Sequence, residues 1–231
     1  MIQHKEVRDK YYKLLLDIRK SNPAEAILML TAFYNEYYNE DEDNKLKNGI
    51  AHEIADNLRK QGKLKEALKG FEELLHDPLL SDMAYHSALV SSLGILIQLN
   101  QKEDAFNMVE TYLEAKHNNS FYYLSALFWY VKNAESSEVQ DLEKYRLLVE
   151  KISNDLEFDI EESDLKKAIT ILAEENHKSN IRYSEVLILI LSHEISKDEA
   201  KKRLKEYIES EKVGFYKNLA LQKISEFERS H

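Results

Sequence analysis

The 231-residue sequence contains no cysteine, only two prolines and only five glycines. Without cysteine the chain has no disulfide framework, no thiol nucleophile and no thiolate zinc site, which fits a cytosolic protein. The scarcity of glycine and proline argues against the many tight turns of a β-sandwich or a β-barrel. Composition therefore points away from disulfide-rich secreted domains and from antiparallel β folds.

Long apolar runs are also lacking. The longest purely aliphatic run, "VLILIL" at residues 186–191, is far shorter than the roughly 20 apolar residues that span a bilayer. The first residues, "MIQHKEVRDKYYK", contain charges throughout and no apolar core of signal-peptide length. We therefore expect a cytoplasmic protein that does not bind membranes.

Positive charge is in deficit, since 42 acidic side chains face 32 basic ones and the formal net charge is −10. Such a chain repels the phosphate backbone, so the composition disfavours nucleic-acid binding. A basic protein or peptide would be attracted instead. The alternative interpretation is that the acidity only keeps the protein soluble.

What the sequence does contain is helical periodicity. Apolar residues recur at spacings of three and four along most of the chain. Examples are Tyr11, Leu14, Leu15 and Ile18, then Ile50, Ile54 and Leu58, then Leu64, Leu68, Phe71 and Leu75. Strict alternation over the length of a strand is hard to find. The pattern predicts an all-α fold of about ten to twelve helices.

Helix ends are legible in several places. Ser21 or Asn22 is expected to cap a helix that begins at Pro23. Ser196 followed by Glu199 has the spacing of a capping box. The polar stretches at residues 157–164 and 177–183 predict loops, and a subdomain break near residues 155–163 could coincide with the first of them.

One helical hairpin resembles a known family. The stretch "IAHEIADNLRKQGKLKEALKGFEELLHDP" is similar to a tetratricopeptide repeat. Its first helix matches the family pattern at Ala51, Ile54, Ala55 and Leu58, and its second helix and stop match at Ala67, Phe71 and Pro78. Looser units precede it, at Tyr11, Leu14, Leu15, Ile18 and Ala26, and follow it, at Leu89, Ser92, Leu93, Leu96, Ala105 and Val109.

The resemblance implies a single helical-repeat domain over residues 1–231. In this family, antiparallel helix pairs stack into a curved α-solenoid because no pair can bury its apolar stripe alone. The alternative is an irregular helical bundle, which can contain the same capped hairpins.

The sequence predicts no catalytic residue, no cofactor and no metal site. His52 begins a stretch similar to a zinc-protease helix, but Asp56 stands where that motif has its second His. The acidic run at residues 39–46 has Leu46 where a calcium loop counted from Asp41 needs Gly. The sequence has neither a glycine-rich phosphate loop nor a Gly-x-Ser-x-Gly elbow. We therefore expect a protein that is not an enzyme.

Two aromatic clusters are candidates for partner binding. Residues 121–130 include six aromatic side chains, among them Tyr122 and Trp129, the only Trp. Phe121, Leu124, Phe128 and Val131 share one face of this predicted helix. Burial between neighbouring helix pairs is the alternative explanation. The second cluster joins Tyr37 and Tyr38 to the acidic residues Asp41, Glu42 and Asp43, and its alternative is a solvated helix end.

The tetratricopeptide resemblance also implies a concave binding face made by the first helix of each pair. In the clearest unit its residues would be His52, Asp56 and Arg59. The looser register adds Tyr12 and Arg19 before them and Val90 and Ile97 after them.

Two functions fit these features. The first is a non-enzymatic scaffold that holds a protein or peptide segment, which the charge predicts to be basic. The second is an acidic immunity or antitoxin-type inhibitor that neutralises a basic toxin such as a nuclease. The sequence does not specify an oligomeric state.

Overall fold

The computed structural model describes residues 2–37, 45–115, 120–134, 139–191 and 195–229. Within these ranges all regular secondary structure is helical and there is no strand, so the all-α prediction is confirmed. The chain divides into two compact units, Met1–His117 and Asn118–His231.

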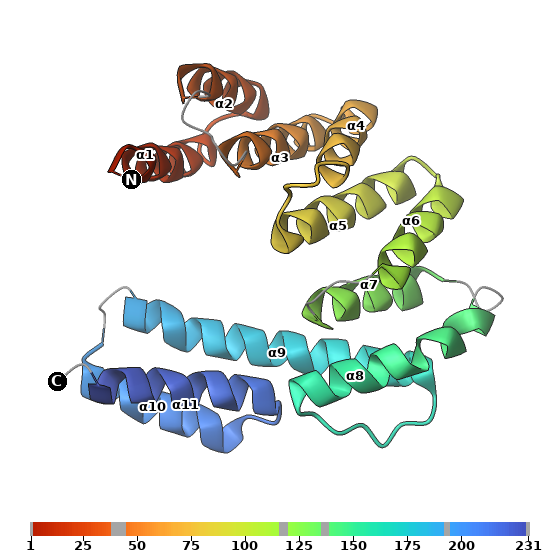
Figure 1. The fold of residues 1–231 in the computed structure, drawn as a ribbon, viewed down its shortest axis with the longest axis vertical. Helices are drawn as coiled ribbons and strands as arrows, with labels where there is room; N and C mark the ends of the chain where they lie inside the picture. Colours follow the sequence, from red (N-terminus) through yellow and green to blue (C-terminus); the bar gives the residue numbers. More distant parts are fainter. Residues whose placement is uncertain (1, 38–44, 116–119, 135–138, 192–194, 230–231) are drawn as a thin grey trace. The chain divides into compact units, whose positions relative to one another are not determined.

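The first unit is a succession of helices in which each packs against the next (Figure 1). Its helices are α1 (Ile2–Ile18), α2 (Pro23–Tyr37), α3 (Lys45–Lys60), α4 (Leu64–Leu75), α5 (Asp82–Gln98) and α6 (Lys102–Glu114). Helix α3 also contacts α5, so the first helices of two successive pairs lie side by side.

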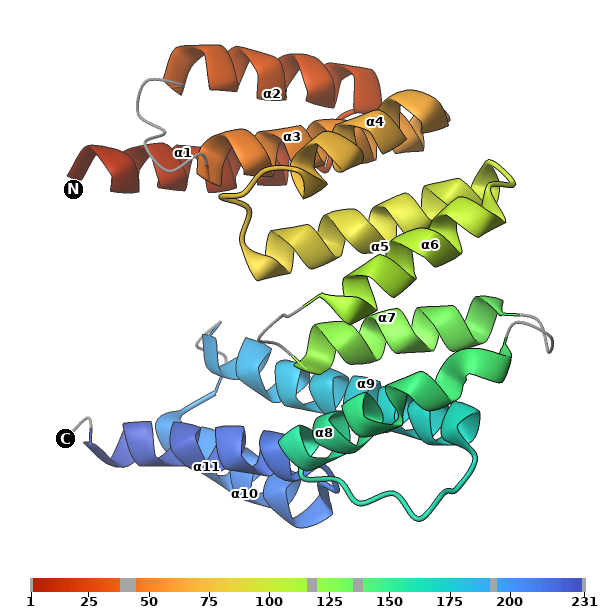
Figure 2. The same ribbon diagram turned by 45° about the vertical axis from the view of Figure 1, so that its right-hand side comes forward.

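The second unit is organised around one long helix. Its elements are α7 (Ser120–Asn133), the 3-10 helix η2 (Val139–Tyr145), α8 (Arg146–Leu156), α9 (Leu165–Leu191), α10 (Lys197–Ser210) and α11 (Gly214–Arg229). Helix α9 contacts α7, α8, α10 and α11, and Figure 2 shows it between α7 and α11. The loop expected at residues 157–164 is confirmed and joins α8 to α9 inside this unit.

The helix ends follow local chemistry. The side-chain oxygen of Asn22 accepts hydrogen bonds from the backbone N–H groups of Ala24 (3.1 Å) and Glu25 (3.0 Å), which caps α2. Ser196 caps α10 by accepting from the N–H of Glu199 at 3.2 Å. Both predicted caps are therefore confirmed.

The hairpin of α3 and α4 is tightly packed, as its small residues predict. Ala67 and Phe71 are both 0% exposed. A Cβ atom at Gly70 would lie 3.2 Å from the Cβ of Ala55 on α3, so the two helices touch where neither has a larger side chain. Gly62 closes the turn before α4 with a φ of +75°, a conformation that favours glycine.

One predicted loop is wrong. Residues 177–183 lie inside α9, not between helices. Their polarity suggested a loop, but the segment contains no glycine or proline to interrupt a helix, and several of its polar side chains have partners. Ser179, for example, is 0% exposed and donates a hydrogen bond to Glu211. Tertiary hydrogen bonds thus hold a weakly apolar stretch in a helix.

Candidate functional site

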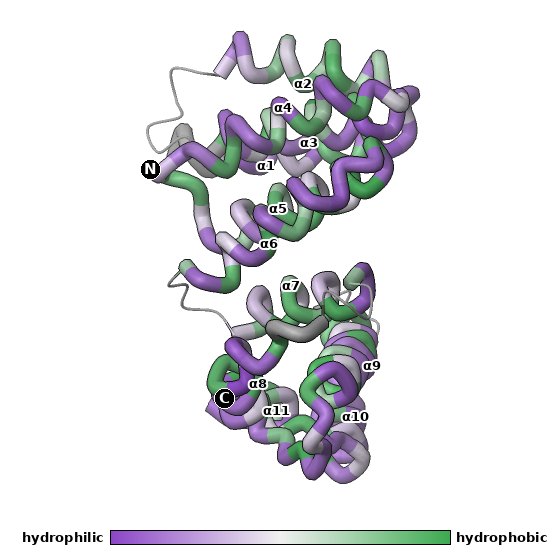
Figure 3. Tube along the Cα trace, turned by 90° about the vertical axis from the view of Figure 1, so that its right-hand side faces the viewer, coloured by the Kyte–Doolittle hydropathy of each residue, from purple (hydrophilic) through white to green (hydrophobic). Residues whose placement is uncertain are grey.

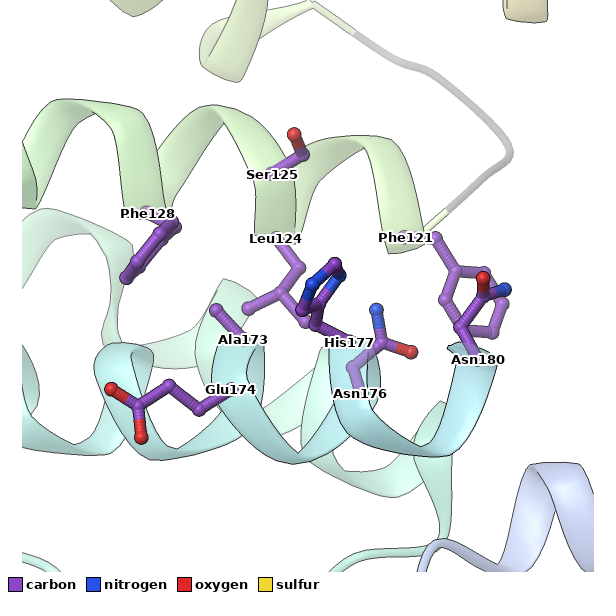
Figure 4. A pocket seen from close by; sticks show the side chains of 9 residues that line it. All are labelled: Phe121, Leu124, Ser125, Phe128, Ala173, Glu174, Asn176, His177 and Asn180. Carbon is purple, nitrogen blue, oxygen red and sulfur yellow. The ribbon is translucent and has the colours of Figure 1, made fainter. Parts of the chain in front are cut away.

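An open groove of about 350 Å³ lies between α7 and α9 in the second unit (Figure 4). Its lining residues are Phe121, Leu124, Ser125 and Phe128 of α7 and Ala173, Glu174, Asn176, His177 and Asn180 of α9. The volume is at the lower end of the range for ligand sites in proteins. The groove is therefore large enough for one or two large side chains or for a small molecule.

The α7 wall is apolar. Phe121, Leu124 and Phe128 share one face of the helix, as the sequence predicts, and Leu124 and Phe128 point toward α9 in Figure 4. Leu124 is 1% exposed and forms the base of the groove, whereas the two phenyl rings are only half-buried. The rings therefore offer apolar area that the chain itself does not fully cover.

Phe121 is held from behind by α11. Its ring centroid lies 4.6 Å from that of Phe215 and 6.5 Å from that of Tyr216. Contacts at these distances and tilted angles stabilise aromatic pairs beyond simple burial. One end of the apolar wall is thus fixed before any ligand arrives.

The α9 wall is polar. The side-chain oxygen of Asn176 accepts a hydrogen bond from the Tyr216 hydroxyl at 3.1 Å, and Asn180 also hydrogen-bonds that hydroxyl. Burial raises the pKa of Tyr216, so it remains a neutral donor at ordinary pH. Tyr216 therefore orients both amides, while Glu174 and His177 stay exposed at the rim.

A buried carboxylate sets the position of α9 relative to α10 and α11. The Glu211 side chain is 0% exposed and accepts hydrogen bonds from the Ser179 hydroxyl (2.6 Å), from Arg182 (2.9 Å), and from the backbone N–H groups of Lys212 (2.8 Å) and Val213 (2.9 Å). Burial alone would raise the pKa of Glu211, but these donors outweigh it and hold the pKa below its usual value. Glu211 is therefore ionised and tethers the α10–α11 turn to α9.

His52, Asp56 and Arg59, which were predicted to line a concave face, all lie on α3. His52 of α3 lies 2.8 Å from the Ser87 hydroxyl of α5, measured from Nε2, and its ring meets that of Phe71 edge-on at 5.2 Å. Asp56 forms ion pairs with both Arg59 and Lys60 at 2.7 Å. Burial would raise the pKa of Asp56, but the hydrogen bonds from these two bases hold it below its usual value.

The remaining candidates of the first unit lie at its helix ends and surface. Tyr12, on α1, is 58% exposed. Arg19, the residue that follows the end of α1, is also exposed. The Tyr37 hydroxyl accepts a hydrogen bond from the Lys10 ammonium at 3.1 Å. Tyr38, Asp41, Glu42 and Asp43 lie outside the described residues.

The two residues of α7 that were predicted to bind a partner are not the ones that line the groove. Tyr122 and Trp129 are half-buried, and neither is among the residues that line the groove. Tyr123 and Tyr130 are buried on other sides of the same helix. The helix is thus covered on several faces, as the alternative explanation of its aromatic content predicts.

The α9 wall of the groove was not predicted from the sequence. Ala173, His177 and Asn180 follow one another at helical spacing and share one face of α9. Because residues 177–183 were predicted to form a loop, these three residues were not predicted to lie on one helix. The local indication of a continuous helix is the helical spacing of the apolar residues, which continues without interruption from Leu165 onward.

Comparison of the chain with protein-family models, with curated proteins and with solved structures found no match. Within the described ranges, no helix is both long and apolar enough to cross a membrane. The same ranges contain no group of three or more His, Asp or Glu side chains placed to hold a metal ion.

We expect His52 to make the first unit less stable in mild acid. Burial lowers the pKa of His52 below its usual 6.5, although Glu53 and Asp56 partly offset the shift. The unfolded chain therefore binds a proton more readily than the folded chain, so stability falls as the pH drops below about 6.5. Denaturant unfolding of His52→Gln between pH 7 and pH 5 should depend less on pH than the wild type. A His52→Gln variant with the same pH dependence as the wild type would contradict this expectation.

Proposed function

We propose that the chain is a non-enzymatic scaffold that binds a segment of another protein in the groove between α7 and α9. The supporting observation is the contrast between the two walls, with half-buried phenyl rings facing amide and carboxylate side chains across about 350 Å³. Apolar area gives such a site affinity, and a few convergent polar groups give it orientation.

An extended peptide suits this groove. One apolar side chain placed between Phe121 and Phe128 would gain roughly 1.5–3 kcal/mol from burial. Asn side chains have both a donor and an acceptor, the same pair that a peptide group presents, so Asn180 at the rim can hydrogen-bond a peptide backbone.

The favoured segment is basic. The chain has a net charge of −10, and the exposed Glu174 lies on the rim of the groove. Lys or Arg next to the apolar anchor would therefore be attracted over long range and paired at close range.

We further propose that the helix pairs form a tetratricopeptide-like α-solenoid in the cytoplasm. The successive packing of α1 to α6 and the contact of α3 with α5 support this arrangement in the first unit. His52 and Asp56 would then lie on the concave face of the first unit.

The second candidate function is an immunity or antitoxin-type inhibitor of a basic toxin such as a nuclease. The acidic net charge favours it, because an inhibitor must compete with an anionic substrate for a basic surface. Genome neighbourhood separates the two functions: a toxin reading frame immediately upstream supports the inhibitor, and its absence weakens it.

The scaffold proposal is tested by selecting random peptides of about 12 residues on the purified protein and measuring affinity by fluorescence anisotropy. We expect the selected peptides to share an apolar residue beside Lys or Arg. The Phe128→Ala variant should weaken their binding by about 10-fold or more, because it removes an aromatic wall of the site.

The matched control is Leu147→Ala, which removes an apolar side chain that is 79% exposed on α8 and outside the groove. Its affinity should equal that of the wild type. Circular dichroism would show that both variants are folded. Failure to enrich any peptide, or equal affinity of a folded Phe128→Ala variant, would contradict the proposal.

A further inference from the structure

The two ends of the groove between α7 and α9 differ in chemistry. Figure 4 shows Phe121 and Asn180 at one end and Phe128 and Glu174 at the other. Figure 3 shows that α7 is mostly apolar or weakly polar, whereas α9 also carries strongly hydrophilic residues. A phenyl ring therefore lies at each end, beside an amide at one end and beside a carboxylate at the other.

The two phenyl rings also differ in their contacts. The Phe121 ring packs against the rings of Phe215 and Tyr216, with centroids 4.6 Å and 6.5 Å away. Phe128 is half-buried, and among the described residues it contacts neither another aromatic ring nor a cation. The face of a phenyl ring carries partial negative charge and attracts cations. The Phe128 ring can therefore receive a cation from outside the chain.

The carboxylate at the same end is not neutralised. Glu174 is exposed and forms no hydrogen bond or ion pair with any residue that the structure describes. Its neighbour Glu175 differs, because it pairs with Lys178 at 2.8 Å. Lys132, one helical turn after Phe128, is exposed and does not pair with Glu174 either. A cation bound at this end would therefore meet a ring and a carboxylate that both lack a cationic partner.

We propose that the end of the groove formed by Phe128 and Glu174 binds an arginine side chain of the partner segment. This inference rests on the proposed function and names the basic residue that the segment must contain. The guanidinium group is planar, so one face can stack on the Phe128 ring while its N–H groups donate to the Glu174 carboxylate. The apolar residue of the segment then lies between the two phenyl rings, over Leu124.

Lysine fits this end less well than arginine. Its ammonium group is a compact, strongly hydrated charge without a flat face, so it loses more hydration on reaching the ring. It also lacks the fork of N–H groups that matches both oxygens of one carboxylate. Long-range attraction to the acidic chain is the same for both residues, because each carries one positive charge. Preference for Arg over Lys therefore separates a specific site from general attraction.

The test uses the tightest-binding peptide from the random-peptide selection, with copies in which Arg is replaced by Lys or by citrulline. The citrulline side chain has the same planar shape but no charge. By fluorescence anisotropy, the Lys copy should bind about 5-fold more weakly and the citrulline copy about 10-fold more weakly, or worse. Glu174→Gln should weaken the Arg peptide by about 10-fold and bring the Arg and Lys peptides within about 2-fold of each other.

The matched control is Glu185→Gln, which removes an exposed carboxylate from the same helix outside the groove and changes the net charge equally. Its affinity for the Arg peptide should equal that of the wild type. Circular dichroism would show that both variants are folded. An equal loss of affinity for Glu174→Gln and Glu185→Gln would overturn the arginine site.

One further outcome separates this inference from the scaffold proposal. Peptides that bind equally well with Lys or Arg, and that Phe128→Ala still weakens, would overturn the arginine site and leave the scaffold proposal standing. Failure to enrich any peptide would overturn both.

Discussion

Replacing Glu211 by Ala should lower the free energy of unfolding of the second unit by about 2–4 kcal/mol. The side chain is 0% exposed and accepts hydrogen bonds from Ser179, Arg182 and two backbone N–H groups. Truncation would leave the Ser179 hydroxyl and the Val213 N–H in the interior without an acceptor, whereas Arg182, whose side chain is 42% exposed, could bind water instead. The α10–α11 turn would then lose its link to α9.

Urea unfolding followed by tryptophan fluorescence is the measurement, because the only Trp, Trp129, lies in the second unit. The exposed Glu209→Ala variant, in the last turn of α10 and two residues before Glu211, is the control and should unfold like the wild type. Since the pKa of Glu211 is held below its usual 4.5, its stabilisation is present above that pH and is lost as the pH falls below it. An unchanged midpoint for Glu211→Ala would show that the carboxylate does not hold the unit together.

Replacing Phe71 by Ala should destabilise the first unit by about 3–5 kcal/mol. The ring is 0% exposed in the α3–α4 hairpin and contacts the edge of the His52 ring. Its removal would leave a cavity. The helices could not move together to fill it, because they are already in close contact at the buried Ala67.

Denaturant unfolding followed by circular dichroism would measure this loss. Leu79→Ala removes an apolar side chain of similar size that is 60% exposed, so its effect should be small. A loss below about 1 kcal/mol for Phe71→Ala would mean that the hairpin is not packed around this ring.

The helices and their ends could be predicted from sequence because local physics determines them. Asn22 and Ser196 cap the helices that follow them, and Gly62 closes a turn that needs positive φ. The small and large residues of the α3–α4 hairpin, Ala67 and Phe71, also indicated where helices meet, and both are buried there.

The candidate site was only half predictable. The shared face of Phe121, Leu124 and Phe128 follows from helical spacing alone, and these residues line the groove. The opposite wall depends on residues 177–183 being helical, which in turn depends on partners distant in sequence. Ser179 bonds Glu211, 32 residues away, and Asn176 bonds Tyr216, 40 residues away. No local pattern specifies such pairs.

Hydrogen–deuterium exchange with and without a selected basic peptide tests the central claim, that a partner segment binds between α7 and α9. The account predicts that binding slows amide exchange in residues 121–128 and 173–180, and that Phe128→Ala abolishes the protection at the same peptide concentration. Protection confined to other helices, or no protection at saturating peptide, would contradict it.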